Sequence, residues 1–215
     1  MKKNTKRALL FALTVATLLS LFACSRADIV VDGNKLKDKR TKITYAPISL
    51  SYEPIEMKDE VYGKTDIYEF HEIVEQDPQK LICEVDGTVF AAKGTTVPTP
   101  DAMSFDYLEI CTDDTNFVVN KTLTDSNSIK AIMLEHLNAD TIKYTGITAT
   151  TAYKLRFADT SLGLYYSVQF LRYEEDLVLP NENGEEINYG KDFIYDRFEG
   201  RFTKAPDALV AVIDG

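Results

Sequence analysis

Several segments of this 215-residue chain alternate apolar and polar side chains with a period of two. Residues 151–158 read TAYKLRFA, and residues 163–173 read GLYYSVQFLRY. Because successive side chains of a strand point to opposite faces, this period predicts half-buried β-strands. The abundance of Tyr and Phe also favours strands. The apolar positions of the two segments are Tyr153, Leu155, Phe157, Leu164, Tyr166, Val168 and Phe170.

Two short signals predict hairpins. Asp86-Gly87 separates two apolar runs, and this pair is typical of a two-residue turn because both turn positions need positive φ. Such a turn would place Cys83 on an apolar face. A second hairpin is expected at Glu199-Gly200, and the apolar run 208–213 is expected to form a closing strand. The cross-strand pairs predicted for the first hairpin are Val85 with Thr88, Cys83 with Phe90, and Leu81 with Ala92.

One segment has helical spacing instead. Apolar residues at 129, 132, 133 and 137 form one stripe, which predicts an amphipathic helix over about 127–139 that packs on its own core. Residues 126–128 offer N-caps. Many strands with one helix predict an α+β fold, mainly antiparallel β-sheet, over residues 43–215, with a subdivision near residue 120 as an alternative to one domain.

The N-terminus has the pattern of a secretory signal. Four cationic residues within 1–7 precede an uncharged apolar run over 8–23. That run is shorter than the roughly 20 residues that span a bilayer as a helix. A retained anchor helix is therefore the less favoured interpretation.

The end of this run carries a more specific motif. Leu21-Phe22-Ala23-Cys24 resembles the lipobox of bacterial lipoprotein precursors. Leu21, Ala23 and Cys24 match the motif, whereas Phe22 departs from it, because that position is usually small or β-branched. The resemblance covers residues 1–24. It implies removal of 1–23, lipidation of Cys24, and a membrane-anchored protein that faces outside the cytoplasm. The alternative is ordinary signal cleavage, for example after Ser25, which would release a secreted protein.

Charge is distributed unevenly along the chain. Residues 1–42 hold ten of the 24 Lys and Arg and three of the 34 Asp and Glu. Residues 43–215 therefore carry 14 basic and 31 acidic residues, a net charge of −17. So acidic a body disfavours a nucleic-acid partner. Residues 24–42 are polar, charged and free of aromatics, and we expect them to form a flexible tether between the lipid and the body.

The cysteines and histidines give few signals of chemistry. If Cys24 is lipidated, Cys83 and Cys111 remain as an even pair that could form a disulfide outside the cytoplasm. Their spacing fits no metal motif. His71 lacks the second histidine of a zinc helix, and His136 lies off the apolar stripe, so both are expected at or near the surface. No metal or cofactor is expected.

Two polar clusters and one aromatic strand complete the candidates. The clusters resemble hard-cation ligands, but turn chemistry explains them better, because Asp and Asn bond their own backbone. Tyr165 and Tyr173 are expected to be exposed and to offer contacts to a partner. The clusters are Asp113, Asp114 and Asn116, and Asn181, Glu182, Asn183 and Glu185.

These features favour a membrane-anchored, extracytoplasmic binding or accessory module without enzymatic activity. Its partner would be an envelope protein or a small ligand. The alternative is a lipid-anchored hydrolase that uses carboxylates or a nucleophile outside the known motifs. No G-x-S-x-G turn and no phosphate-binding glycine loop support that alternative.

Overall fold

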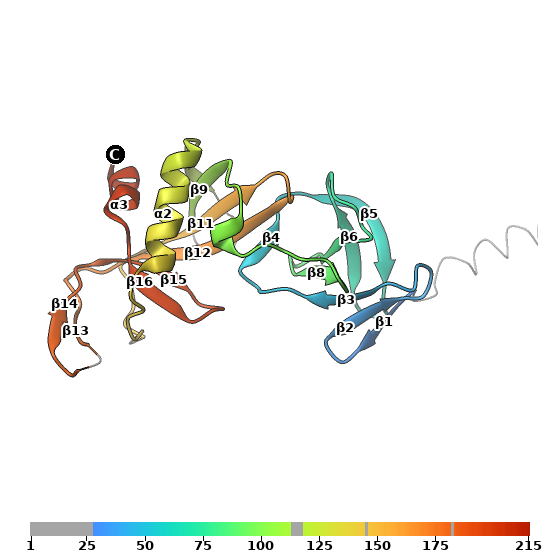
Figure 1. The fold of residues 1–215 in the computed structure, drawn as a ribbon, viewed down its shortest axis with the longest axis horizontal. Coiled ribbons are helices and arrows are strands. Elements are labelled where there is room, and N and C mark those ends of the chain that lie inside the picture. Colours follow the sequence, from blue (N-terminus) through green and yellow to red (C-terminus); the bar gives the residue numbers. More distant parts are fainter. Residues whose placement is uncertain (1–27, 113–117, 145, 182) are drawn as a thin grey trace, which may run out of the picture.

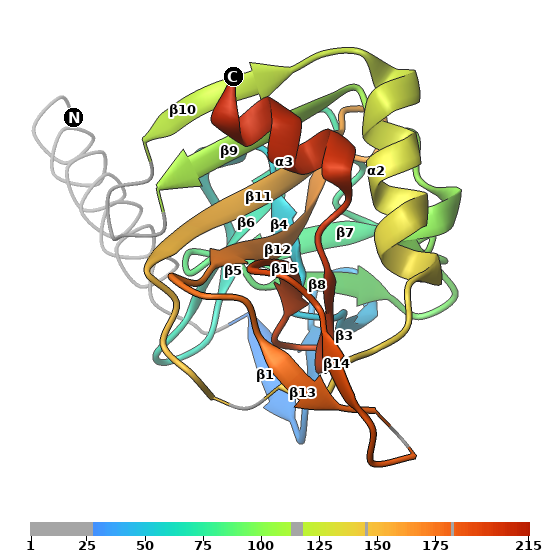
Figure 2. The same cartoon turned by 90° about the vertical axis from the view of Figure 1, so that its left-hand side faces the viewer.

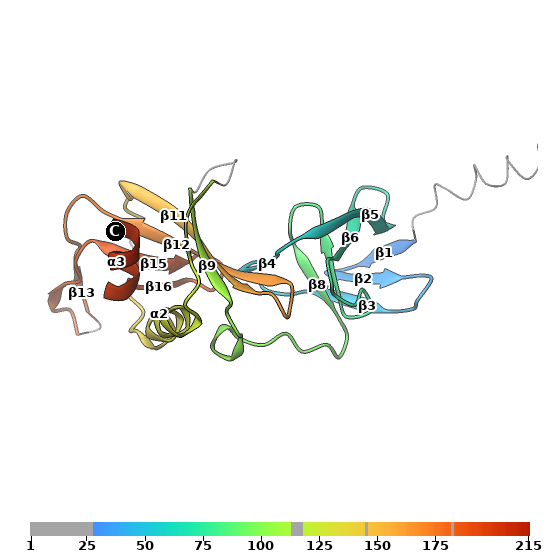
Figure 3. The same cartoon turned by 90° about the horizontal axis from the view of Figure 1, so that it is seen from above.

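A computed structural model describes residues 28–112, 118–144, 146–181 and 183–215. The molecule is elongated, with one β-sheet at each end of its long axis (Figure 1). Seen from above, the sheet formed by the first half of the chain lies beside the sheet and helices formed by the second half (Figure 3). Among the described residues, neither α-helix has the length and hydropathy needed to cross a bilayer.

The first sheet has seven antiparallel strands and curls until its two edges meet. Asp28 N donates to Lys64 O at 3.1 Å, and Lys64 N donates to the Asp28 carboxylate at 2.7 Å. The interior of the curled sheet holds a buried apolar cluster that includes Ile29, Tyr45 and Phe70. In spatial order the strands are β1 (Ile29–Asp32), β2 (Lys35–Asp38), β3 (Thr44–Pro47), β8 (Val89–Ala92), β7 (Leu81–Glu84), β6 (Glu69–Ile73) and β5 (Met57–Lys64).

The expected flexible tether over 24–42 is wrong for the residues that the structure describes. Residues 29–38 form the β1–β2 hairpin, which turns at Gly33 with φ 63°. Ile29, Leu36 and Asp38 are all at most 4% exposed, because they point into the curled sheet. The folded body therefore begins before Ile43, and Lys35 and Lys37 lie on the outer face of the hairpin.

The hairpin at Asp86-Gly87 is confirmed, but its predicted register is wrong by one residue. Cys83 pairs with Val89 rather than with Phe90. The chain reverses over a longer turn, in which Gly87 N donates to Glu84 O at 2.9 Å and Glu84 N donates to Thr88 O at 2.8 Å. Because side chains alternate along a strand, this one-residue shift sends Phe90 into the first sheet's interior and Cys83 to its other face.

The second sheet contains the strands predicted from alternation, and its longest strands, β11 and β12, pair over nine residues. The final hairpin at Glu199-Gly200 is also confirmed. In spatial order the strands are β10 (Val119–Leu123), β9 (Tyr107–Thr112), β11 (Thr151–Asp159), β12 (Leu164–Arg172), β15 (Asp192–Asp196) and β16 (Arg201–Lys204). β13 (Val178–Pro180) and β14 (Glu186–Asn188) form a separate two-stranded ribbon.

Two α-helices cover one face of the second sheet (Figure 2). The predicted helix is confirmed as α2 (Ser126–Asn138), although its N-cap is Asp125, which accepts from Ser128 N. The expected closing strand over 208–213 is wrong, because this run forms α3 (Asp207–Asp214) after Pro206. A short apolar run does not distinguish strand from helix by itself, and here Leu209 is the residue that reaches the core.

The two sheets share one apolar core. Ile73 and Leu81 of the first sheet pack in the same buried cluster as Phe157 and Leu164 of the second. β4 (Tyr52–Pro54) comes from the first half of the chain but pairs with β12 of the second sheet. The connection between β8 of the first sheet and β9 of the second runs over 93–106 and includes a 3-10 turn at Pro100–Ala102.

Candidate functional site

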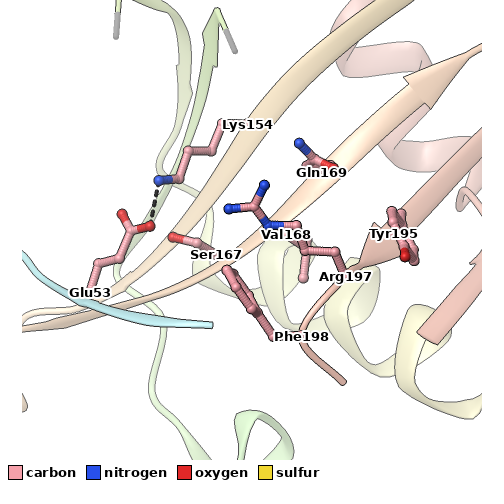
Figure 4. Close-up of a pocket in the computed structure, with 8 residues that line it drawn as sticks. All are labelled: Glu53, Lys154, Ser167, Val168, Gln169, Tyr195, Arg197 and Phe198. Atoms are coloured by element: carbon pink, nitrogen blue, oxygen red, sulfur yellow. Dashed lines mark hydrogen bonds and ion pairs between the residues drawn. The ribbon is translucent and has the colours of Figure 1, made fainter. Parts of the chain in front are cut away.

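A hollow lies between β4 and β15, two strands that pair with different stretches of the same edge of β12. Leu164–Tyr166 pair with β4, and Gln169–Arg172 pair with β15. Between these stretches the edge is left open, except that Ser167 N donates to Ser51 O at 2.7 Å. The hollow has a volume of about 130 Å³, and Figure 4 shows the side chains that line it. It is lined by Glu53, Lys154, Ser167, Val168, Gln169, Tyr195, Arg197 and Phe198.

Strand register explains why these side chains meet. Lys154 lies opposite Gln169 across β11 and β12, and Gln169 lies opposite Tyr195 across β12 and β15. Cross-strand partners share a face, so these polar residues form one floor. The alternate residues, such as Leu155, pack into the core beneath α2. The floor is therefore the face of the sheet that turns away from α2 and α3.

Ion pairs organise the floor. Lys154 forms an ion pair with Glu53, and Arg156 pairs with both Glu53 and Glu109 at 3.7 and 3.4 Å. The guanidinium of Arg156 also lies over the ring of Tyr165, 3.9 Å from its centroid. These charged side chains are only 16–24% exposed, so they exchange part of their hydration for one another.

Two buried atoms of the floor have no hydrogen-bond partner. Ser167 is 6% exposed, and its Oγ bonds to no described residue. Arg156 Nε also lacks a hydrogen-bond partner, because the Glu53 carboxylate with which it pairs lies 3.7 Å away. Arg156 and Ser167 are cross-strand neighbours. Unpartnered buried polar groups are rare and costly, so the floor holds unused hydrogen-bonding capacity at this point.

The turn between β15 and β16 supplies a cation and an aromatic ring. Arg197 lies in the middle of the hollow's residues, with Ser167 and the Glu53–Lys154 pair to one side and Tyr195 to the other (Figure 4). Its guanidinium lies 4.6 Å from the centroid of the Phe198 ring, and it forms no ion pair with a described residue. Phe198 is 42% exposed, which is unusual for so large an apolar side chain.

A buried carboxylate fixes this turn. Asp196 is 1% exposed and accepts hydrogen bonds from Ser51 Oγ, from Tyr166 OH at 2.6 Å, and from the backbone N–H groups of Phe198 and Glu199 at 3.0 Å. Burial and this carboxylate raise the pKa of Tyr166 well above its usual range. The network ties β4, β12 and the turn together, so it positions Arg197 over the hollow. No local pattern in the sequence could predict this network, because Ser51 and Asp196 are distant along the chain.

The residues singled out in the sequence lie elsewhere. Cys24 is outside the described residues. Cys83 in β7 and Cys111 in β9 are both buried free thiols in different sheets, so the candidate disulfide is not formed. Burial raises the pKa of Cys83 to about 12 and also raises that of Cys111. Neither thiol is therefore poised as a nucleophile.

The expectation that both histidines lie at or near the surface is wrong for His136. His136 is 1% exposed, and its Nδ1 lies 2.7 Å from Thr203 Oγ1, because the face of α2 that carries it packs against β16. Burial and the nearby charge of Arg201 lower its pKa to about 4. His71, in β6, is partly buried, and its Nδ1 lies 2.8 Å from Lys58 O. The structure does not bring the two histidines into the hollow.

The expected exposure of Tyr165 and Tyr173 is also wrong, since both are 4% exposed. β12 is covered on both faces: Arg156 lies over Tyr165, and Phe193 packs edge-on against Tyr173. The aromatic residues exposed on this part of the molecule are instead Phe198 and Tyr144, which stacks on Tyr195 with centroids 4.5 Å apart.

The polar clusters behave as turns where they are described. Asn181 Oδ1 accepts from the backbone N–H groups of Asn183 and Glu185, both at 2.9 Å. This is the side-chain-to-backbone bonding predicted for the segment. Glu182 and the cluster Asp113, Asp114 and Asn116 are outside the described residues. Within the described ranges, no three His, Cys, Asp or Glu residues are grouped as a metal ion would require.

Comparisons of the chain with protein-family models, with curated proteins and with solved structures give no match.

Proposed function

We propose that this chain is a membrane-anchored, extracytoplasmic binding module, attached to the lipid bilayer through Cys24 and without enzymatic activity. Two independent features support the proposal. The first is the lipobox-like motif at Leu21–Cys24. The second is the hollow beside Ser167, which combines a rigid sheet floor, unpartnered hydrogen-bonding atoms and an exposed cation.

The observation that carries the binding role is the pair of unpartnered atoms, Ser167 Oγ and Arg156 Nε, beside the hollow. Unpartnered buried polar groups destabilise a folded chain, and they are retained most readily where a ligand forms the missing hydrogen bonds. The hollow's other groups are a guanidinium, an ammonium, an amide and aromatic rings. This is the composition of a recognition site, in which apolar walls surround a few fixed polar groups.

The hydrolase alternative has weaker support. Ser51 and Asp196 are a buried serine and carboxylate in contact near the hollow, and Ser51 Oγ lies 2.9 Å from both carboxylate oxygens. Both residues are at most 1% exposed, and the carboxylate already accepts from Tyr166 and two backbone N–H groups. A nucleophile must be reachable by substrate and activated by a base with spare capacity, so this pair suits a structural role.

The fold also suits anchoring at Cys24. Only three residues lie between Cys24 and Asp28, where the described structure begins, and the four steps from one to the other span at most about 14 Å. β1 lies at one end of the long axis, and α3 and the β13–β14 ribbon lie at the other (Figure 1). An anchored molecule would therefore hold the first sheet near the bilayer and direct the second sheet, with its hollow, outward.

Metabolic labelling with an alkyne fatty acid tests the anchor. Cells expressing the wild-type chain, Cys24→Ala and the control Ser25→Ala are labelled and separated into membrane and medium. We expect label and membrane retention in the wild type and in Ser25→Ala, and the loss of both in Cys24→Ala. Unlabelled wild-type protein, whether in the medium or in the membrane, would contradict the proposed anchor.

A further inference from the structure

We propose that the hollow beside Ser167 binds the carboxylate of a small organic acid that carries one ring-sized apolar group. This inference rests on the proposed binding function and adds the chemical class of the ligand. It follows from the hydrogen-bonding atoms, the charge balance and the apolar wall of the hollow.

The unpartnered atoms require an acceptor. Arg156 Nε–H can only donate, and the Ser167 hydroxyl has a proton to donate. Ser167 lines the hollow, and Arg156 is its cross-strand neighbour, so a ligand group that reaches Ser167 Oγ ends beside Arg156. The guanidinium of Arg197, over the same hollow, adds further donors. A group with two acceptor oxygens fits this set of donors.

The charges of the floor favour one negative charge on that group. Among the residues that line the hollow, Lys154 and Arg197 supply two cations and Glu53 supplies one anion, while Arg156 and Glu109 lie outside the lining and pair with each other. The floor therefore has an excess of one positive charge in a chain whose formal net charge is −10.

Two other carboxylates, Asp196 and Glu199, lie near the hollow but are not among the residues that line it. The Asp196 carboxylate lies on the core side of β15, where it accepts a hydrogen bond from Tyr166 OH. The Glu199 carboxylate accepts a hydrogen bond from Ser49 Oγ at 2.6 Å. A carboxylate matches the single excess charge. A phosphate, with nearly two charges, would place the second one beside Glu53.

The wall and the size of the hollow specify the rest of the ligand. The rings of Tyr195 and Phe198 give the hollow an apolar side next to its cations. The volume of about 130 Å³ is close to that of a protein cavity of about 150 Å³ that holds benzene. A carboxylate attached to one ring or to a branched chain of similar size would place its charge at Arg197 and its apolar part against Phe198.

Calorimetric titration of the full-length chain in detergent micelles tests the inference. The probes are sodium benzoate, its neutral analogue benzamide, and inorganic phosphate, each corrected by titration into protein-free micelles. We expect saturable binding of benzoate, at least about tenfold weaker binding of benzamide, and no binding of phosphate, because a hydrogen bond to a charged group is stronger than one to a neutral group.

Two variants locate the binding. Arg197→Gln should weaken benzoate binding about tenfold or more and leave the folded structure intact, because Arg197 is exposed and forms no ion pair with a described residue. Ser167→Ala should also weaken it, because it removes the unpartnered hydroxyl. Lys204→Gln is the matched control, since it removes an exposed cation on β16 outside the hollow and should leave binding unchanged.

The remaining outcomes overturn the inference. Equal binding of benzamide and benzoate would mean that the hollow recognises a ring and not an anion. Tighter binding of phosphate than of benzoate would assign the site to a different anion. Binding unchanged by Arg197→Gln would place the ligand elsewhere, and the absence of binding by every probe would remove the carboxylate assignment. None of these results affects the lipid-labelling experiment, so the anchor and the ligand class fail separately.

Discussion

At the residue scale, the polar side chains inside this protein fall into two groups. Asp196 and Ser51 have partners for their hydrogen bonds, whereas Ser167 does not. Ser167, in β12, is nearly buried, and Ser51, next to β4, is fully buried. The same substitution at the two positions should therefore have opposite effects on stability.

Ser167→Ala should stabilise the ligand-free protein by about 1 kcal/mol, because it removes a buried hydroxyl that bonds to nothing in the described structure. Ser51→Ala should destabilise it by about 1–3 kcal/mol, because Asp196 then loses a donor. Chemical unfolding followed by circular dichroism measures both. A stability loss in Ser167→Ala would show that the hydroxyl has a structural partner.

His136 should make the stability depend on pH. The folded chain holds the pKa of His136 near 4, whereas the unfolded value is 6.5, so below 6.5 the unfolded chain binds a proton that the folded chain does not. Stability should therefore fall as pH falls through this window, by about 2 kcal/mol between pH 7 and pH 5. Unfolding measured at both pH values should show the loss in the wild type and in His71→Gln, and a smaller loss in His136→Gln.

At the scale of single elements, the sequence predicted what local patterns can specify. The period-two alternation around Leu155 predicted the strands, and the helical spacing of apolar residues around Ile129 predicted α2. Each period identifies the side chains that share one buried face. The alternation did not show that Arg156 would cover Tyr165, because their contact depends on the pairing register of β11 and β12, which neither strand specifies alone. The hollow was missed for the same reason: it depends on where β4 ends and β15 begins along β12.

The C-terminal end of α2 offers a test at this scale. Arg201 on β16 donates to three carbonyls at this end, those of His136, Leu137 and Ala139. Such carbonyls lack partners within the helix. Arg201→Gln should therefore destabilise the protein by about 2 kcal/mol. Thermal unfolding should show a clear decrease in the midpoint, and Lys204→Gln on the same strand should show almost none. Equal midpoints for the two variants would contradict a capping role for Arg201.

At the scale of the whole molecule, one shared apolar core joins the two sheets. Cys83 faces this core from the first sheet, and Cys111 lies in the second sheet. Both are 0% exposed. The sequence could indicate an even pair of cysteines, but pairing depends on which faces the strands present, and the register at β7 and β8 was decided by the turn at Gly87.

The two thiols should therefore react only when the whole molecule unfolds. Without any reductant, iodoacetamide should leave Cys83 and Cys111 of the folded chain unmodified, because both are buried and their pKa values are raised. In denaturant, again without reductant, mass spectrometry should find both alkylated. Alkylation in denaturant only after a reductant is added would instead reveal a disulfide.

The insertion of β4 into the second sheet also sets an order of assembly. Residues 52–54 are synthesised more than one hundred residues before their partners at 164–166. Until β12 has been synthesised, β4, which contains Glu53, has no strand to pair with. Closing the long loop between β4 and β12 is among the slower steps of folding. The hollow, which needs Glu53 from one half of the chain and Arg197 from the other, is thus completed only when nearly the whole chain has been made. A prematurely terminated product could fold its first sheet and still lack the site.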